Sequence, residues 1–159
     1  MVIELKEVVV EPRMRGLCRL PYPGHPRGCP NFGRKAGCPP SCPMIGDAID
    51  LGRPVFAIVN EFDLAAHVLR MRLRHPGWSE RQFVCCLYWQ PTARKHLTAK
   101  LMAFLAAHPD YVSDACPEAG GVNVTETLRR AGLELEWPPV KVARQVALAG
   151  IPARGRPGR

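Results

Sequence analysis

The sequence predicts a single α/β domain, with a mixed sheet flanked by helices and an irregular cysteine-rich loop near the N-terminus. The 159 residues are the length of one compact domain. Short apolar runs typical of strands alternate with longer segments of helical periodicity. Residues 16–43 hold seven Pro, five Gly and four Cys, a density that breaks both helix and strand. We expect the domain over 1–152 and a basic, flexible tail over 153–159.

Four elements are expected in the first half of the chain. Residues 2–10 and 54–60 are apolar runs typical of strands, the second of them buried. A short helix is expected over 47–51. Apolar side chains at i, i+3, i+4 and i+7 predict a helix over 63–74, because this spacing places them on one face.

The next segments alternate in the same way. Residues 81–89 are ambiguous: their aromatic side chains and Val84 favour a strand, which we expect, whereas their length also permits a helix. Leucines at helical spacing predict a helix over 92–108. A strand is expected over 111–116. A helix is expected over 124–131, because Asn123 with Glu three residues later has the form of an N-terminal cap.

Two further strands complete the expected sheet. Leu133, Leu135 and Trp137 alternate with acidic residues, which is typical of a half-exposed strand. A strand is expected over 140–148, and it joins by a route other than a two-residue hairpin, because Pro138-Pro139 cannot form such a turn.

Charge and motifs exclude several classes of protein. The net charge of +8 suits an anionic partner. No apolar run approaches the roughly 18–20 residues that span a bilayer, so no membrane partner is expected. The first residues lack the features of a secretory signal, which predicts a cytoplasmic protein. No phosphate-binding loop, dinucleotide fingerprint or serine-nucleophile elbow is present.

Four of the seven cysteines lie in the proline-rich loop and suggest a metal site. Cys18, Cys29, Cys38 and Cys42 have the spacing C-x10-C-x8-C-x3-C, and a proline follows each of the last three. In a reducing compartment such a set indicates metal binding or reactive thiols rather than disulfides. Structural zinc sites usually pair their ligands in close knuckles, and only the last spacing fits. An iron–sulfur cluster is therefore favoured, with zinc as the alternative. We expect the four sulfurs to meet in one small volume. The alternative is that Cys18 points away and that Cys116 joins Cys29, Cys38 and Cys42 instead.

The charges around these cysteines agree with such a site. No acidic residue lies between Glu11 and Asp47, whereas six basic residues do: Arg13, Arg15, Arg19, Arg27, Arg34 and Lys35. Nearby cations are expected to lower the pKa values of the thiols and to balance a thiolate site. His25 is either a loop residue or a further ligand.

The remaining cysteines are less specific. Cys116 ends a predicted strand before a capped helix, where open α/β sheets place ligand sites. It is a further cluster ligand, a functional thiol with Glu118 as a possible acid or base, or part of a structural loop. Cys85 and Cys86 would point to opposite faces of a strand, at least one of them into the core.

Two of these segments resemble a known family. Cys38-Pro39-Pro40 after upstream cysteines, and the segment 116–132 (CPEAGGVNVTETLRRAG), are similar to the two ends of the predicted metal-binding proteins known as domain of unknown function 2284. The resemblance covers about half of the chain. It implies a metal or iron–sulfur site and brings no established reaction.

The sequence thus predicts a cytoplasmic iron–sulfur protein that supports redox or sulfur chemistry with a small molecule or a redox partner. Whether it is an enzyme stays open. One alternative is a zinc-stabilised module that binds nucleic acid, which sparse aromatic residues near the basic ones make less favoured. The other is a metal-free thiol enzyme that uses Cys116.

Overall fold

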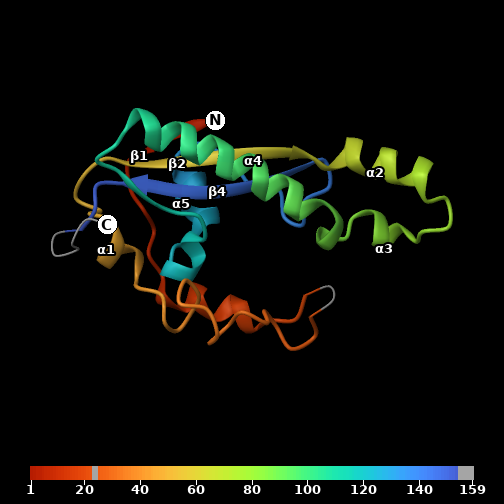
Figure 1. Ribbon diagram of the computed structural model, residues 1–159, viewed down its shortest axis with the longest axis horizontal. Helices are drawn as coiled ribbons and strands as arrows, with labels where there is room; N and C mark the ends of the chain where they lie inside the picture. Colours follow the sequence, from red (N-terminus) through yellow and green to blue (C-terminus); the bar gives the residue numbers. More distant parts are fainter. Residues whose placement is uncertain (23–24, 154–159) are drawn as a thin grey trace.

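An antiparallel sheet of four strands, in the order β1-β2-β4-β3, forms the centre of the protein (Figure 1). The computed structural model describes residues 1–22 and 25–153. The strands are β1 (Val2–Leu5), β2 (Val55–Asp63), β3 (Val112–Asp114) and β4 (Val142–Gly150). The expected α/β domain is confirmed, and its sheet is antiparallel throughout instead of mixed.

Helices cover both faces of this sheet. The α-helices are α1 (Ile45–Ala48), α2 (Leu64–Arg74), α3 (Glu80–Phe83), α4 (Cys86–Ala107) and α5 (Val124–Arg130). Two 3₁₀ helices are η1 (Pro12–Arg19) and η2 (Pro117–Gly120). In Figure 1, α4 runs along one face, while α1, α5 and the cysteine-rich loop lie on the other. The helices expected over 63–74, 92–108 and 124–131 are therefore confirmed.

The alternation of side chains along β2 explains this layering. Ala57 and Val59 belong to one core, which α1 and α5 complete. Ile58 points to the opposite face and packs against Leu97 and Leu101 of α4. Successive residues of a strand face opposite sides, so a continuous apolar run supplies both cores at once.

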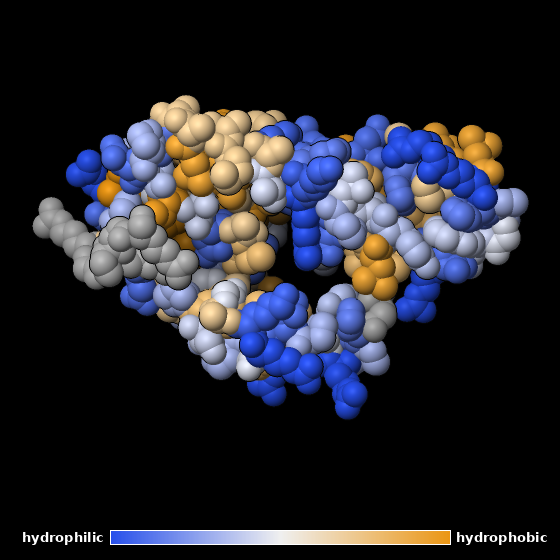
Figure 2. Space-filling view, viewed as in Figure 1, coloured by the Kyte–Doolittle hydropathy of each residue, from blue (hydrophilic) through white to orange (hydrophobic). Residues whose placement is uncertain are grey.

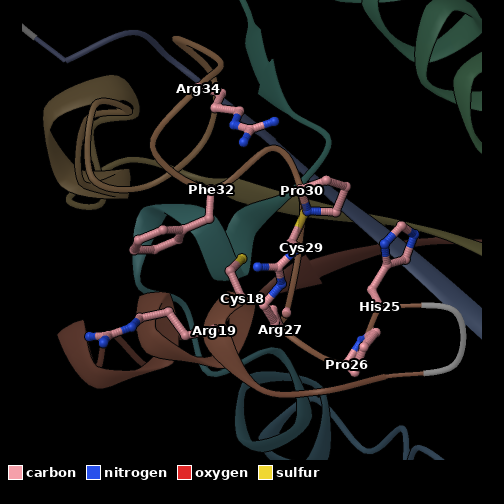
Figure 3. Close-up of a pocket in the computed structure, with 10 residues that line it drawn as sticks. Cys18, Arg19, His25, Pro26, Arg27, Cys29, Pro30, Phe32 and Arg34 are labelled. Atoms are coloured by element: carbon pink, nitrogen blue, oxygen red, sulfur yellow. The ribbon is translucent and has the colours of Figure 1, made fainter.

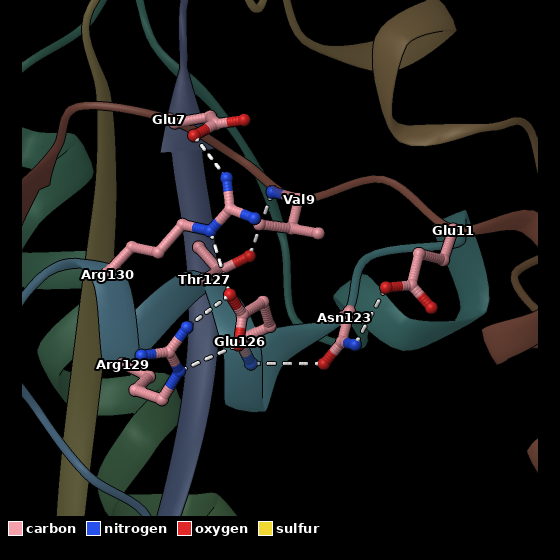
Figure 4. Close-up of polar contacts among 8 residues, drawn as sticks. All are labelled: Glu7, Val9, Glu11, Asn123, Glu126, Thr127, Arg129 and Arg130. Carbon is pink, nitrogen blue, oxygen red and sulfur yellow. Dashed lines mark hydrogen bonds and ion pairs between the residues drawn. The ribbon is translucent and has the colours of Figure 1, made fainter.

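The N-terminal segment departs from the sheet after β1 and is tied to α5 (Figure 4). The Val9 N–H donates to the Thr127 hydroxyl at 3.0 Å. The Asn123 side chain donates to Glu11 at 3.1 Å and also accepts the Glu126 N–H at 3.1 Å, which caps α5. The strand expected over 2–10 is therefore shorter, because its second half bonds to α5 instead of β2.

The strand expected over 81–89 is wrong. Residues 80–83 form α3, and α4 begins at Cys86. Ser79 and Gln82 make a capping box, in which the Ser79 N–H donates to the Gln82 side chain at 2.9 Å. This start signal for a helix is present in the sequence and outweighs the β propensity of the residues that follow.

The strand expected over 133–137 is also wrong. Strand β4 pairs with β2 along its whole length and with β3 only over Leu148–Gly150, and residues 133–137 make no backbone pairing with the remaining edge. The Glu136 carboxylate accepts hydrogen bonds from the N–H groups of Lys141 and Val142 at 3.0 and 3.3 Å. This segment therefore contacts the start of β4 through a side chain and does not pair with it as a strand.

The remaining predictions concern shorter elements and the end of the chain. The expected strands at 54–60, 111–116 and 140–148 correspond to β2, β3 and β4, and the expected helix at 47–51 corresponds to α1. Residues 154–159 of the expected tail lie outside the described part of the chain. Within the described residues, no helix combines the length and apolar character needed to cross a membrane.

Candidate metal centre

The cysteine-rich loop is a series of tight turns that begins in η1. Backbone hydrogen bonds connect its cysteines: the Cys29 N–H donates to the Cys18 carbonyl at 2.7 Å, and the Cys42 N–H to the Cys38 carbonyl at 3.0 Å. The first bond holds Cys29 beside Cys18, and the second holds Cys42 beside Cys38.

Gly28 allows the first of these contacts. Its φ is +84°, and a Cβ there would lie 2.7 Å from the Cys18 carbonyl oxygen and 2.8 Å from the Arg19 carbonyl. Only glycine tolerates both this backbone angle and this close approach. The glycine thus brings Cys29 against the end of η1, which carries Cys18.

Cys18 and Cys29 line one cavity of about 730 Å³ (Figure 3). Other residues on its walls are His25, Arg27, Phe32 and Arg34. His25 packs on Tyr22 with ring centroids 4.7 Å apart. The cavity therefore combines two thiols with the guanidinium groups of loop arginines.

Cys42 attaches the other end of the loop to η2. Its side chain is buried, and its thiol donates to the Ala119 carbonyl at 3.1 Å. Arg15 supports this contact by donating to the carbonyls of Pro40 and Cys42 at 2.8 and 2.7 Å. The loop is thereby held beside η2, and the residue that precedes η2 is Cys116.

The thiol of Cys18 lies in an electrostatic environment that disfavours its ionised form. Burial raises the pKa of Cys18, and Cys29 and Cys38 raise it further, with smaller contributions from Glu118 and Cys42. The expectation that loop cations lower the thiol pKa values is wrong for Cys18, because burial, the neighbouring cysteines and Glu118 raise its pKa instead. A cation bound among these thiolates would reverse the effect.

Cys116 belongs to the same electrostatic group. Burial raises the pKa of its thiol, as do Asp114, Glu118 and Cys38, whereas Arg94 lowers it. Burial also raises the pKa of Glu118. Cys38 therefore acts on both Cys18 and Cys116, which connects the loop to a residue 78 positions further along the sequence.

The cysteine sulfurs of the candidate site do not form a metal-binding group in the described part of this structure. Within residues 1–22 and 25–153, no group of three or more His, Cys, Asp or Glu side chains is arranged to hold a metal ion. The expected small volume shared by the four loop sulfurs is thus not formed in this structure. All seven cysteines are free thiols. The donor set fits a thiophilic metal or cluster in its chemistry, while ligation would require the sulfurs to move together.

Cys85 and Cys86 lie at the N-terminal end of α4 and not in a strand. Cys86 packs partly buried against the core around Phe62 and Trp89. Burial raises the pKa of its thiol, and Cys85 raises it further. The prediction of opposite strand faces is therefore wrong, because both residues belong to a helix start, while the packing of Cys86 agrees with the expected core role.

A second pocket, of about 300 Å³, adjoins Cys116. We call it the Arg94 pocket; its walls include Trp89, Arg94, Leu97, Cys116, Trp137 and Gln145. Figure 2 shows a hollow between the loop and the layer that contains α4. Sequence reasoning missed Arg94 and Gln145, since neither belongs to a motif and the fold alone brings α4, β4 and η2 together.

No protein-family model, curated protein or solved structure matches this chain. The resemblance to domain of unknown function 2284 therefore remains a prediction from the quoted residues.

Proposed function

We propose that this chain is a metal-binding protein in which four of the five cysteines Cys18, Cys29, Cys38, Cys42 and Cys116 supply the ligands of an iron–sulfur cluster. The cluster would support redox or sulfur chemistry. The observation that carries the proposal is that free cysteines of two distant segments lie near one another: Cys18 and Cys29 line one cavity, and the Cys42 thiol bonds to Ala119 of η2, the helix that Cys116 precedes. Their thiols also act on one another electrostatically.

The surroundings of the cysteines support a site that carries negative charge. A cluster held by four thiolates has surplus negative charge, which nearby cations stabilise. Arg27 and Arg34 line the same cavity as Cys18 and Cys29. Arg15 lies against Cys42, with a guanidinium nitrogen 3.7 Å from its sulfur.

A cluster fits this arrangement better than a single zinc ion. Zinc draws four ligands to about 2.0–2.3 Å from one centre, whereas a cluster distributes its ligands over separate iron atoms. Cysteines that line a cavity of about 730 Å³ without converging on one point suit the second case. Zinc remains the alternative that the experiment distinguishes.

A metal-free thiol enzyme that uses Cys116 is less well supported. The thiolate is the reactive form of cysteine, so a nucleophilic cysteine needs a lowered pKa. The pKa of Cys116 is raised, by burial first and then by Asp114 and Glu118. No observation favours a nucleic-acid module over the cluster.

The test is the metal and sulfide content, with the ultraviolet–visible spectrum, of the protein purified without oxygen. We expect iron, acid-labile sulfide and visible absorption in the parent. Zinc without sulfide would indicate the zinc alternative and overturn the cluster, and the absence of any metal would overturn the metal site itself.

Two variants locate the site. Cys38→Ser is expected to lose the metal and to make the loop sensitive to protease, while α4 and the sheet persist on their own cores. Cys85→Ser is the matched control and should keep its metal. A Cys38→Ser protein with unchanged metal content and protease resistance would contradict the proposed ligand set.

A further inference from the structure

The Arg94 pocket has a rigid apolar wall. Trp89 is buried, stacks on Phe62 with ring centroids 5.4 Å apart, and donates its indole N–H to the Val84 carbonyl at 3.1 Å. Leu97 is also buried on this wall. Trp137 stands at the pocket with 87% of its surface exposed. A large aromatic side chain left uncovered beside a pocket offers a contact surface for the apolar part of a ligand.

Arg94 supplies a positive charge in the same pocket, whose walls also include the carboxyl side chains of Glu118 and Glu136. Within the described part of the chain its guanidinium makes no hydrogen bond or ion pair, although it acts electrostatically on Cys116 and Cys86. Arg144, the other arginine of the pocket, donates to Glu61 at 2.8 Å. The fork of the Arg94 guanidinium is therefore available to bind a carboxylate through two parallel hydrogen bonds.

Gln145 adds an unsatisfied polar group. It lines the pocket from β4, and its side-chain oxygen is buried with no hydrogen-bond donor within the described residues. Buried polar atoms are rarely left without a partner, so such an atom indicates a missing water or ligand group. A bound molecule that donates a hydrogen bond would satisfy it.

From these three features we infer that the Arg94 pocket binds a small organic carboxylate with an aromatic or other apolar body. The carboxylate pairs with Arg94, the apolar body lies against Trp89 and Trp137, and a donor group of the ligand reaches Gln145. The volume of about 300 Å³ is at the lower end of the range for small-molecule sites.

The position of the pocket gives this ligand a role. Cys116 lies on the pocket wall and directly precedes η2, whose Ala119 carbonyl accepts the Cys42 thiol of the loop. A carboxylate bound at Arg94 therefore lies beside Cys116, one of the candidate ligands of the metal centre. This part of the inference rests on the proposed function, and it makes the ligand the substrate of the chemistry performed there.

The test uses two probes with the same apolar body, 2-naphthoate and its uncharged methyl ester; neither has a donor for Gln145, so the pair tests the contact with Arg94 alone. Calorimetric titration of the full chain should give a dissociation constant about tenfold or more lower for the carboxylate, because a hydrogen bond to a charged group adds about that much. Arg94→Gln should remove this preference. Lys100→Gln, which removes an exposed cation of the same helix outside the pocket, should keep it.

Nuclear magnetic resonance of the indole N–H groups locates the probe. The signals of Trp137 and Trp89 should shift when 2-naphthoate binds, and the signal of Trp78 should not, since Trp78 stacks on His75 away from the pocket. Undetectable binding, equal binding of both probes, or an Arg94→Gln protein that behaves like Lys100→Gln would overturn the inference.

The same titrations, with and without bound metal, separate the two proposals. Naphthoate binding in a protein that never takes up metal would leave the carboxylate site standing and overturn both the cluster and the substrate role. A metal-loaded protein that binds neither probe would overturn the carboxylate site alone.

Discussion

Gly28→Ala should loosen the cysteine-rich loop more than an alanine at Gly16, Gly33 or Gly37, the other glycines that the structure describes there. An alanine at φ +84° costs about 1–2 kcal/mol on conformational grounds alone, a factor of about 5–30 in an equilibrium. Its Cβ would also lie 2.7 Å from the Cys18 carbonyl oxygen and 2.8 Å from the Arg19 carbonyl, so the two backbone segments must separate. The total cost should therefore exceed the conformational cost.

Hydrogen exchange of the Cys29 amide measures this loosening directly, because this N–H donates to the Cys18 carbonyl. Protection of this amide should fall by more than about 30-fold in Gly28→Ala. Amides in the β2–β4 ladder should keep their protection, since the loop lies outside both cores of the sheet.

Gly33→Ala is the matched control for the clash. Its φ is +69°, yet a Cβ there would meet no atom within 4 Å, so only the conformational cost applies. If the Cys29 amide lost no more protection in Gly28→Ala than in Gly33→Ala, the close approach of Gly28 to Cys18 would not be what orders this part of the loop.

Three further predictions concern the stability of the domain. Asn123→Ala should reduce the free energy of unfolding by about 1–2 kcal/mol in urea titrations, more than Asp63→Ala, because Asn123 caps α5 and also bonds to the N-terminal segment. Hydrogen bonds from Arg129 and Arg130 lower the pKa of Glu126 to about 2, so its contribution to stability is present above the unfolded pKa near 4.5 and disappears as the pH falls through about 2. The stability difference between the parent and Glu126→Gln, measured by thermal unfolding, should therefore vanish over this pH window. A difference that stays constant with pH would contradict the prediction. Leu128→Ala should cost about 2–5 kcal/mol because Leu128 is fully buried, whereas Leu73→Ala, at a side chain 86% exposed, should cost less than about 0.5 kcal/mol.

Much of the fold could be predicted because its longer elements carry a local pattern. Helix α4 has leucines at helical spacing, Asn123 is an N-cap residue that marks the start of α5, and β2 begins with a short apolar run. The direction of the strands could not be predicted, since pairing depends on contacts between distant segments. The segment 81–89 shows a different failure, in which aromatic and β-branched residues suggested a strand although Ser79 and Gln82 begin a helix there.

The candidate site divides in the same way. Spacing and composition identified the cysteines of the loop, and the place of Cys116 before a capped helix marked it as a candidate. Sequence could not show that the Cys42 thiol bonds to the Ala119 carbonyl, which brings the two segments together. Arg94 and Gln145 carry no local signal, because only the packing of α4 beside β4 gives them a common pocket.

The way the loop is held indicates why metal binding and loop order should be coupled. Among its described residues only Gly28, Pro39 and Cys42 are buried, so apolar burial offsets little of the roughly 1–2 kcal/mol that ordering each residue costs. Cys42 stabilises the loop as a thiol that donates to Ala119, a role that it loses as a thiolate ligand. Recruiting Cys42 therefore replaces one attachment of the loop by another, whereas recruiting the free thiol of Cys116 adds an attachment without breaking a hydrogen bond made by its sulfur in the described part of the chain. Of the two, Cys116 is the ligand that the structure makes easier to recruit.

A comparison of Cys42→Ser with Cys116→Ser checks this. We expect the larger loss of bound metal in Cys116→Ser. A larger loss in Cys42→Ser would show that the hydrogen bond between Cys42 and Ala119 breaks when the metal is bound.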